Sequence, residues 1–349
     1  MADDRRLKVL SAIVTDFVRT REPVGSRALA ERYRLGVSPA TIRNDMAALE
    51  DEGYIHQPHT SAGRVPTEKG YRLFVDEVAR VKPLSGPERA AITALLTGEA
   101  DLEQVVARTV RVLAQLTGQL AVVEYPSLRL TSLRHLELVA LGPTRVLVVI
   151  ITDTGRVEQR TVVMDGEVID LPALEHLRVR LNAALVGSRA ADVVPVLESL
   201  AEQAPEEQRL LLRAVTGAIV DALRPDAEER LVVAGTANLA RSTPDFSSLG
   251  PLLDAVEEQV VLLRLLADGG APASRAAGDG MRVSIGSENH DEALAEASVV
   301  SASYTAGSQD AVAHLGVIGP TRMDYPATMA SVRAVARYLT RFLSGTDPR

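Results

Sequence analysis

The stretch SPATIRNDMAALEDEGYIHQPHTSAGRVPT, residues 38–67, decides the fold of the N-terminal part of this chain. Ser38 followed by Pro39 is typical of a helix start, because the serine hydroxyl can cap free backbone N–H groups and proline fits the first helical turn. The helical pattern continues to about Glu52. Two short strands then flank a polar turn, which predicts a β-hairpin. The predicted elements are a helix over 38–52 and strands over 54–57 and 64–66.

Two further helices are predicted before this stretch. Apolar residues recur at helical spacing over residues 5–20, and a shorter helix is predicted over 26–33. Three short helices followed by a hairpin with a polar tip are typical of a winged helix-turn-helix fold. In that fold the third helix fills the major groove of DNA, where its N-terminal residues meet base edges. Residues 1–82 are therefore predicted to form a DNA-binding domain.

The outward face of the third helix carries the residues expected to contact bases. Ile42, Met46 and Leu49 share the inward face of a helical wheel, so the opposite face is free. Arg43 has the geometry to bind two acceptors of guanine, and Asn44 can bind adenine in the same way. Small side chains let the helix approach the groove closely, and the helix start favours a phosphate. The DNA-binding candidates on this helix are Ser38, Ala40, Thr41, Arg43, Asn44 and Ala47.

The turn between the two strands carries groups suited to the DNA backbone. Its hydroxyls and its arginine can bind phosphate oxygens, an arginine can also enter the minor groove, and the glycine allows a tight turn. Arg21, Arg27, Lys69 and Arg72 could add phosphate contacts from around the module. The candidates in the wing and after it are His59, Thr60, Ser61, Gly63, Arg64, Lys69 and Arg72.

Several of these candidates also have a purely structural interpretation. Arg43 could pair with Glu50 or Asp51 on a solvated helix face. Asn44 could be an ordinary exposed helix residue, and Arg64 could be a hairpin residue that touches nothing. The sequence alone leaves these alternatives open.

The composition of the 349-residue chain excludes several kinds of site. It contains no cysteine, which rules out disulfide scaffolds, thiolate metal sites and cysteine nucleophiles. His56 and His59 lack the acidic or sulfur partners of a metal site. No nucleotide-binding glycine motif or serine-hydrolase motif occurs. We therefore expect no enzymatic activity, no metal and no cofactor.

The net charge of −8 by itself argues against nucleic acid, but its distribution changes that conclusion. Residues 1–82 carry 14 Lys and Arg against 12 Asp and Glu, a net of +2, whereas the remaining 267 residues carry 24 against 34, a net of −10. The strongest apolar run, residues 146–151, is too short to cross a membrane, and no apolar signal core follows the start. We expect a cytoplasmic protein without membrane contact.

The rest of the chain mixes strands and helices. Strand-rich segments are predicted over 119–164 and 281–318, with a helical block over 165–230. The expected fold class is α+β with several domains. Two polar segments, SENHDE at 287–292 and PTRMDY at 320–325, could line a ligand pocket. Their structural alternatives are a solvated loop and a turn locked by an Arg–Asp pair.

The hairpin and its neighbours resemble a known family. The run HTSAGRVPTEKGYR at 59–72, preceded by TIRNDM at 41–46 and LEDEGYI at 49–55, is similar to the bacterial heat-inducible transcription repressor family HrcA. The run GVIGPTRMDY at 316–325 continues the resemblance. Between these motifs the resemblance rests on the order of the elements, and it covers the whole chain in length and layout.

The resemblance implies an N-terminal winged helix-turn-helix, a split GAF-like α/β domain and an inserted helical dimerising domain. It also implies a homodimeric repressor of heat-shock chaperone operons that binds double-stranded DNA at an inverted-repeat operator, is relieved by heat and is assisted by the chaperonin GroEL. The alternative is a repressor that senses a small metabolite through the GAF-like domain. The expected domains are 1–82 for DNA binding, 83–118 for a linker and connecting helix, 119–164 with 231–349 for the GAF-like domain, and 165–230 for the insertion.

Overall fold

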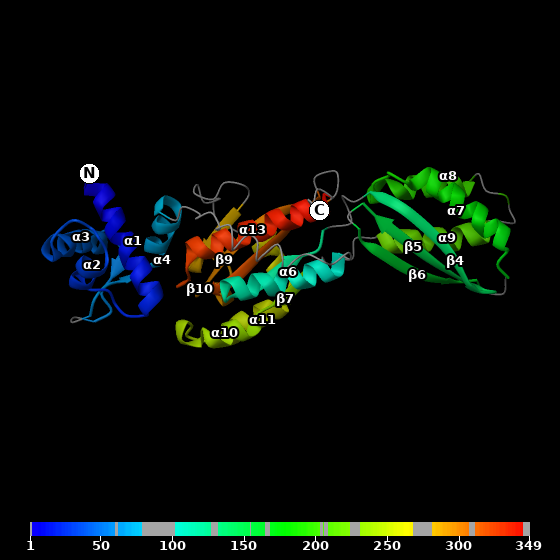
Figure 1. The fold of residues 1–349 in the computed structure, drawn as a ribbon. Helices are drawn as coiled ribbons and strands as arrows, with labels where there is room; N and C mark the ends of the chain where they lie inside the picture. The colour runs from blue at the N-terminus through cyan, green and yellow to red at the C-terminus, as the bar shows by residue number, and fades with distance from the viewer. Residues whose placement is uncertain are drawn as a thin grey trace.

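The computed structural model arranges the chain as three bodies in a row (Figure 1). The N-terminal body is mainly helical, the middle body is a five-stranded sheet between helices, and the third body is a three-stranded sheet covered by helices. This mixed architecture confirms the predicted α+β fold with several domains. The structure describes residues 2–59, 62–78, 102–126, 132–153, 155–164, 168–202, 205, 209–223, 231–267, 281–306 and 311–344.

The N-terminal body has the predicted order of three helices and a hairpin. Ile42, Met46 and Leu49 are buried, as expected, and they share a core with Leu10 and Ile13 of the first helix. The two strands of the hairpin pair antiparallel. The elements are α1 (Ala2–Thr20), α2 (Ser26–Arg32), α3 (Pro39–Asp51), β1 (Ile55–His56), β2 (Val65–Pro66), α4 (Glu68–Leu73) and the π-helical turn η1 (Phe74–Val78).

The middle body is an antiparallel sheet with the strand order β7-β3-β10-β9-β8. Ala121 and Val123 of β3 lie in one core with α6 and α13, whereas Leu120 and Val122 lie in another with α10, α11 and α12, so helices cover both faces. The strands are β3 (Leu120–Glu124), β7 (Leu231–Ala234), β8 (Met281–Ile285), β9 (Ala297–Ala306) and β10 (Ala311–Pro320). The helices are α6 (Leu102–Thr117), α10 (Thr236–Arg241), α11 (Gly250–Glu257), α12 (Gln259–Ala267) and α13 (Tyr325–Leu343).

The third body is a separate unit with a core of its own. Its antiparallel strands have the order β4-β5-β6. Leu136, Val148 and Val162 of these strands share a core with Leu181 of α7 and Ile219 of α9. The elements are β4 (Leu133–Gly142), β5 (Arg145–Thr152), β6 (Val157–Val163), α7 (Leu171–Leu185), α8 (Val193–Glu202) and α9 (Arg209–Leu223). Short 3-10 turns lie at Ala190–Asp192, Thr243–Asp245, Gly286–Asn289 and Glu292–Leu294.

This third body corrects the expected domain boundary at residue 165. Residues 133–163 fall within the predicted split domain, but their strands pair with one another and pack on α7 and α9. Sheet membership depends on pairing between distant residues, which hydropathy along the chain does not reveal. The chain leaves the middle sheet after β3 and returns in β7, and these strands are neighbours, with Ala121 opposite Ala234. Helix α6, expected as a connection, belongs to the core of the middle body.

Candidate nucleic-acid interface

Helix α3 begins as its sequence predicts. Ser38 Oγ accepts a hydrogen bond from the backbone N–H of Thr41 at 3.2 Å and lies 3.0 Å from Thr41 Oγ1. Pro39 occupies the first turn. Ser38 and Thr41 therefore act together as a cap, which fixes where the helix starts and which of its side chains face outward.

The face of α3 opposite the core is exposed. Ala40, Arg43, Asn44 and Ala47 all lie on this face. Arg43 and Asn44 form no hydrogen bond or ion pair with any other residue that the structure describes. The alternative in which Arg43 pairs with an acidic neighbour on its own helix is therefore not what the structure shows. Two side chains with base-reading chemistry stand free on a solvent-facing surface.

A pair of charged side chains holds α3 on α1. Arg5 Nε donates to Asp45 Oδ2 at 2.7 Å, and Arg5 Nη2 donates to Asp45 Oδ1 at 2.9 Å. Asp45 is only 4% exposed. Two parallel bonds between a guanidinium and a carboxylate fix orientation as well as distance. The pair therefore fixes how α3 is turned about its own axis, and with it the direction in which the neighbouring Arg43 and Asn44 face. Sequence reasoning missed this pair, although an aspartate on an apolar helix face is a signal that a partner is needed.

The C-terminal end of α3 is held by α4. Lys69 Nζ donates to the carbonyl oxygen of Glu52 at 2.8 Å and lies 4.6 Å from the centre of the Tyr54 ring. A lysine at this place interacts favourably with the negative end of the helix dipole. The structure thus gives Lys69, which was expected at a phosphate, a capping role at the end of α3.

The wing is anchored by Val24, which lies between α1 and α2. Val24 and Arg64 exchange two backbone hydrogen bonds of 2.9 Å, which place a third extended segment beside the hairpin. Gly63 lies against this segment, and a Cβ there would be 2.5 Å from the carbonyl carbon and oxygen of Val24. Gly63 is therefore required for the close approach of two backbones.

Arg64 lies at the base of the wing and ties it to α3. Its Nε and Nη2 atoms contact Glu50 Oε2 at 2.9 and 2.7 Å, and 24% of its side chain is exposed. Arg64 is therefore not a hairpin residue without contacts. Its partner Glu50 is one of the two acidic residues that the sequence suggests as partners of Arg43. At the tip, His59 is exposed, whereas Thr60 and Ser61 lie outside the described residues.

Arg72 is directed at the middle body. Its Nε donates to Glu288 Oε1 at 2.8 Å, its Nη2 donates to the carbonyl oxygen of Val283 at 2.7 Å, and its Nη1 lies 3.4 Å from Asp76. Only 20% of the side chain is exposed. The guanidinium that the sequence predicts at a phosphate is therefore occupied by protein groups at the junction of two bodies.

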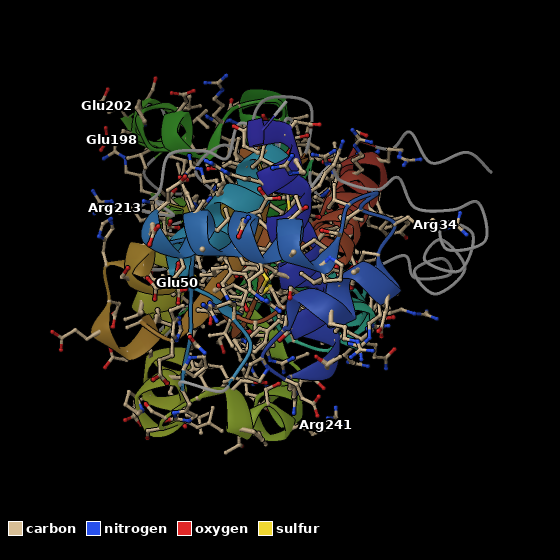
Figure 2. All side chains as sticks on the ribbon, turned by 90° about the vertical axis from the view of Figure 1, so that its left-hand side faces the viewer. Arg34, Glu50, Glu198, Glu202, Arg213 and Arg241 are labelled. Carbon is tan, nitrogen blue, oxygen red and sulfur yellow. The ribbon has the colours of Figure 1, made fainter. Side chains whose placement is uncertain are left out.

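Arg34, on the turn before α3, is an exposed arginine that sequence reasoning did not select. It forms no ion pair with another residue in the described part of the chain. Figure 2 views the molecule from its N-terminal end, with Arg34 and Glu50 on opposite sides of the nearest body. An unpaired cation beside the recognition helix has the chemistry to bind a backbone phosphate.

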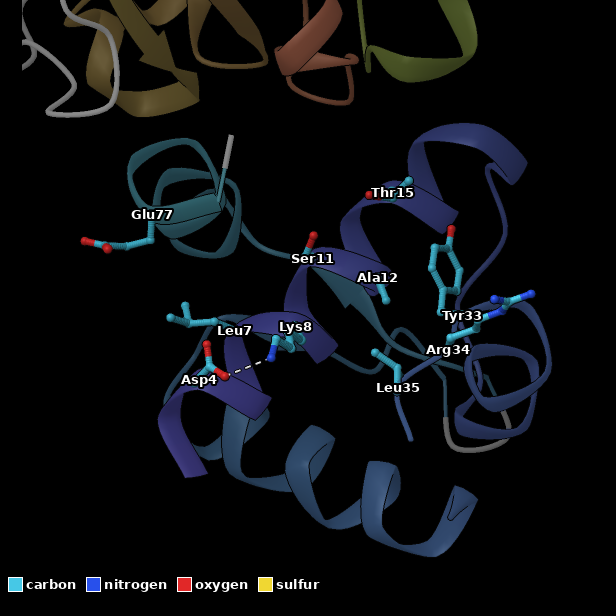
Figure 3. A pocket seen from close by; sticks show the side chains of 10 residues that line it. All are labelled: Asp4, Leu7, Lys8, Ser11, Ala12, Thr15, Tyr33, Arg34, Leu35 and Glu77. Carbon is cyan, nitrogen blue, oxygen red and sulfur yellow. Dashed lines mark hydrogen bonds and ion pairs between the residues drawn. The ribbon is translucent and has the colours of Figure 1, made fainter. Parts of the chain in front are cut away.

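A groove of about 440 Å³ opens between α1 and the turn that joins α2 to α3 (Figure 3). Leu7, Ala12 and Leu35 supply apolar lining, and Lys8 at the rim is paired with Asp4 at 2.9 Å. None of the lining residues comes from α3. The groove and the exposed face of α3 are therefore separate features of the N-terminal body.

Two family models match the chain. The DeoR-like helix-turn-helix domain matches residues 15–67, which include α2, α3 and the hairpin, and the HrcA protein C terminal domain matches residues 103–329. The heat-inducible transcription repressor HrcA of Beutenbergia cavernae is 58% identical to this chain over 99% of it and 100% of its own length. The chain belongs to the HrcA family of heat-inducible transcription repressors.

Further relatives support the same assignment. The HrcA repressor of Streptomyces avermitilis is 56% identical over 99% of both chains. A crystal structure of a protein described as hypothetical covers 99% of both chains at 26% identity, with a TM-score of 0.61. The HrcA relatives are named as transcription repressors, so the role of the family is DNA binding rather than catalysis.

In this member of the HrcA family, the polar segment 287–292 has protein partners. Ser287 Oγ donates to Glu68 Oε2 at 2.6 Å, and Glu288 pairs with Arg72. Both partners belong to α4 of the N-terminal body. The segment is therefore part of the contact between two bodies, rather than the solvated loop that was its structural alternative.

The second polar segment, 320–325, also joins two bodies. Arg322 Nε and Nη2 each donate to Asp245 at 2.8 Å, and Arg322 Nη1 donates to the carbonyl oxygen of Val18 at 2.7 Å. Asp324 caps the start of α13. The Arg–Asp pair of the structural alternative thus exists, but the aspartate comes from a distant turn. Both polar segments therefore hold the N-terminal body and the middle body together.

Within the described ranges, no helix is long and apolar enough to cross a membrane. The same part of the chain brings together no group of three or more His, Asp or Glu side chains that could hold a metal ion.

Proposed function

We propose that this protein represses chaperone operons by placing α3 in the major groove of an inverted-repeat operator. The observation that carries the proposal is the exposed Arg43–Asn44 pair, on a helix whose opposite face is fixed in the core. Arg43 binds O6 and N7 of a guanine, and Asn44 binds N6 and N7 of an adenine. Ala40 and Ala47 are small enough for the helix to approach base edges closely.

The surroundings of α3 supply the backbone contacts in this proposal. The exposed Arg34 binds a phosphate on one side of the recognition helix. His59, together with the hydroxyls of Thr60 and Ser61, has the chemistry to bind phosphate oxygens from the wing. Arg64 contributes indirectly, because its ion pair with α3 sets the position of the wing.

The proposed operator has two-fold symmetry, so the protein should bind it as a two-fold dimer. Of the thirteen exposed large apolar side chains among the described residues, ten lie in the third body. Val139, Val157 and Val163 lie on the face of the β4-β5-β6 sheet that α7 and α9 leave uncovered. Exposed apolar area gathered on one body is typical of a protein interface. A second copy of this chain is the partner we propose for it.

Relief by heat follows from the same apolar surface. A dimer that dissociates on heating exposes these side chains, which are the kind of surface that chaperones bind. The chaperonin GroEL is accordingly the proposed partner that restores the active dimer after synthesis or stress. When heat draws the chaperonin to other proteins, repression lapses.

Fluorescence anisotropy tests the proposed function directly. The duplex carries the inverted repeat from the chaperonin promoter of the host, and the control duplex carries the same bases in scrambled order, both at near-physiological salt. We expect tight binding that needs the intact repeat and that improves when chaperonin is added. Equal, weak binding to both duplexes, with and without chaperonin, would contradict the proposal.

A further inference from the structure

Helix α4 is attached to the recognition helix on one side. Thr67 Oγ1, at its start, donates to the carbonyl oxygen of Gly53 at 2.7 Å. Gly70 lies so close to the hairpin that a Cβ there would be 2.1 Å from the carbonyl oxygen of Tyr54. Lys69 adds its bond to the last turn of α3. These contacts make α4 move together with the C-terminal end of α3.

The same helix is attached to the middle body on its other side. Arg72 binds Glu288 and the carbonyl oxygen of Val283, which belongs to the edge strand β8. The ring of Tyr71 packs against that of Tyr325, with 5.8 Å between their centres. Helix α4 is therefore a short rigid connection between the DNA-reading helix and the sheet of the middle body.

A second anchor lies at the C-terminal end of α1. Asp245 binds Arg322 through two bonds and also pairs with Arg21 at 3.2 Å. Arg322 in turn donates to the carbonyl oxygen of Val18. Two anchors at different places hold the N-terminal body against rotation on the middle body.

We propose that the Arg72–Glu288 pair determines which spacing between operator half-sites the protein accepts. The inference rests on the proposed dimer. When each DNA-reading body is fixed on its own middle body, the distance and angle between the two α3 helices of a dimer are fixed as well. Half-site spacing is then a geometric property of the protein. A body that has lost one of its two anchors can turn about the other, so the two modules of a dimer then reach half-sites at several spacings.

Arg72 acts in this proposal as a positioning residue that does not touch DNA. This role has a signature different from that of a phosphate contact. Loss of one phosphate contact lowers the slope of log affinity against log salt by about one. Loss of a positioning contact changes the spacing preference and leaves that slope unchanged.

The experiment uses the full-length chain and duplexes in which two identical half-sites are separated by spacers that vary over about one helical turn. We expect wild type to prefer its best spacing over a half-turn shift by about 100-fold, since only one geometry lets both modules bind. Arg72→Met and Glu288→Gln should each reduce this preference to about tenfold or less, because each substitution removes one partner of the same ion pair. Their affinity for a single half-site should stay that of wild type.

Two controls accompany these variants. Arg27→Met removes the same charge and an exposed ion pair with Glu31 from the same body, so it should keep the wild-type spacing profile. The exchange of Arg72→Glu with Glu288→Arg should restore part of the spacing preference.

The possible results separate this inference from the proposed function. Wild-type spacing profiles in both Arg72→Met and Glu288→Gln would overturn the inference. So would a salt slope reduced by about one in Arg72→Met alone, since that result identifies a phosphate contact. A wild-type chain that sediments as a monomer and shows no preferred spacing would overturn the proposed dimer, and this inference with it.

Discussion

At the scale of single residues, Asp45 decides how α3 sits on α1. It is a charged side chain in the core, and its partner Arg5 comes from a helix 40 residues away. Removing one partner of such a pair leaves a buried polar group with unmade hydrogen bonds. We expect Asp45→Asn to lower the free energy of unfolding by roughly 1 to 3 kcal/mol, because the amide cannot accept both guanidinium bonds.

Urea unfolding of the full-length chain measures this effect. Asp51→Asn is the matched control, since Asp51 is exposed on the same helix, and it should change stability by less than about 0.5 kcal/mol. Equal stability of the two variants would show that the Arg5–Asp45 pair does not hold α3 in place.

The residues of the interface divide by the range of their contacts. The cap at Ser38 and the exposed positions of Arg43 and Asn44 could be predicted from the sequence, because capping and helix faces depend on neighbours only three or four residues away. The contacts of Arg64 and Arg72 could not be predicted, since their partners lie 14 and 216 residues away and the local sequence pattern does not indicate such distant partners. A basic residue near a DNA-binding motif is thus an ambiguous signal.

At the scale of elements, the contact between α4 and α13 depends on two buried tyrosines. Burial raises the pKa of Tyr71 and of Tyr325 above the ordinary value of 10.0, so both phenols stay neutral at physiological pH. Tyr325 Oη bonds Ser298 and the carbonyl oxygen of Thr321, whereas Tyr71 Oη has no hydrogen-bond partner among the described residues.

This difference predicts opposite effects of the same substitution. Tyr325→Phe should lower the free energy of unfolding by roughly 1 to 2 kcal/mol, because it removes a bonded hydroxyl. Tyr71→Phe should leave stability unchanged or raise it, since it removes an unsatisfied polar group from the core. Thermal unfolding of both variants checks the pair. A larger loss for Tyr71→Phe than for Tyr325→Phe would contradict the assigned contacts.

The elements themselves were largely predictable, but their grouping into sheets was not. The strands β4, β5 and β6 all lie inside the segment 119–164 that the sequence predicts to be rich in strands. Their membership in a separate sheet follows from packing against α7 and α9, which come later in the chain. Local pattern therefore located the strands, and only three-dimensional packing assigned them to a body.

At the scale of the whole molecule, the uncovered face of the β4-β5-β6 sheet is the predicted dimer interface. Val163 is 59% exposed on that sheet. We expect Val163→Lys to fold normally and to shift the protein from dimer to monomer, because burial of an unpaired charge in an apolar interface is unfavourable. Val312→Lys, at an exposed strand position of the middle body, should remain dimeric. Sedimentation over a range of concentrations distinguishes the two, and a dimeric Val163→Lys would exclude this face as the interface.

In the proposed function, Arg43 binds a base of the operator from the exposed face of α3. The most direct measurement compares the affinities of wild type and Arg43→Ala for the intact and the scrambled repeat at one salt concentration. Arg213→Ala, which removes an exposed charge from α9 in the third body, is the control. Arg43→Ala should lose about 1 to 3 kcal/mol of discrimination per half-site, whereas Arg213→Ala should keep the wild-type value. Unchanged discrimination by Arg43→Ala, with the fold intact, would contradict this role of Arg43.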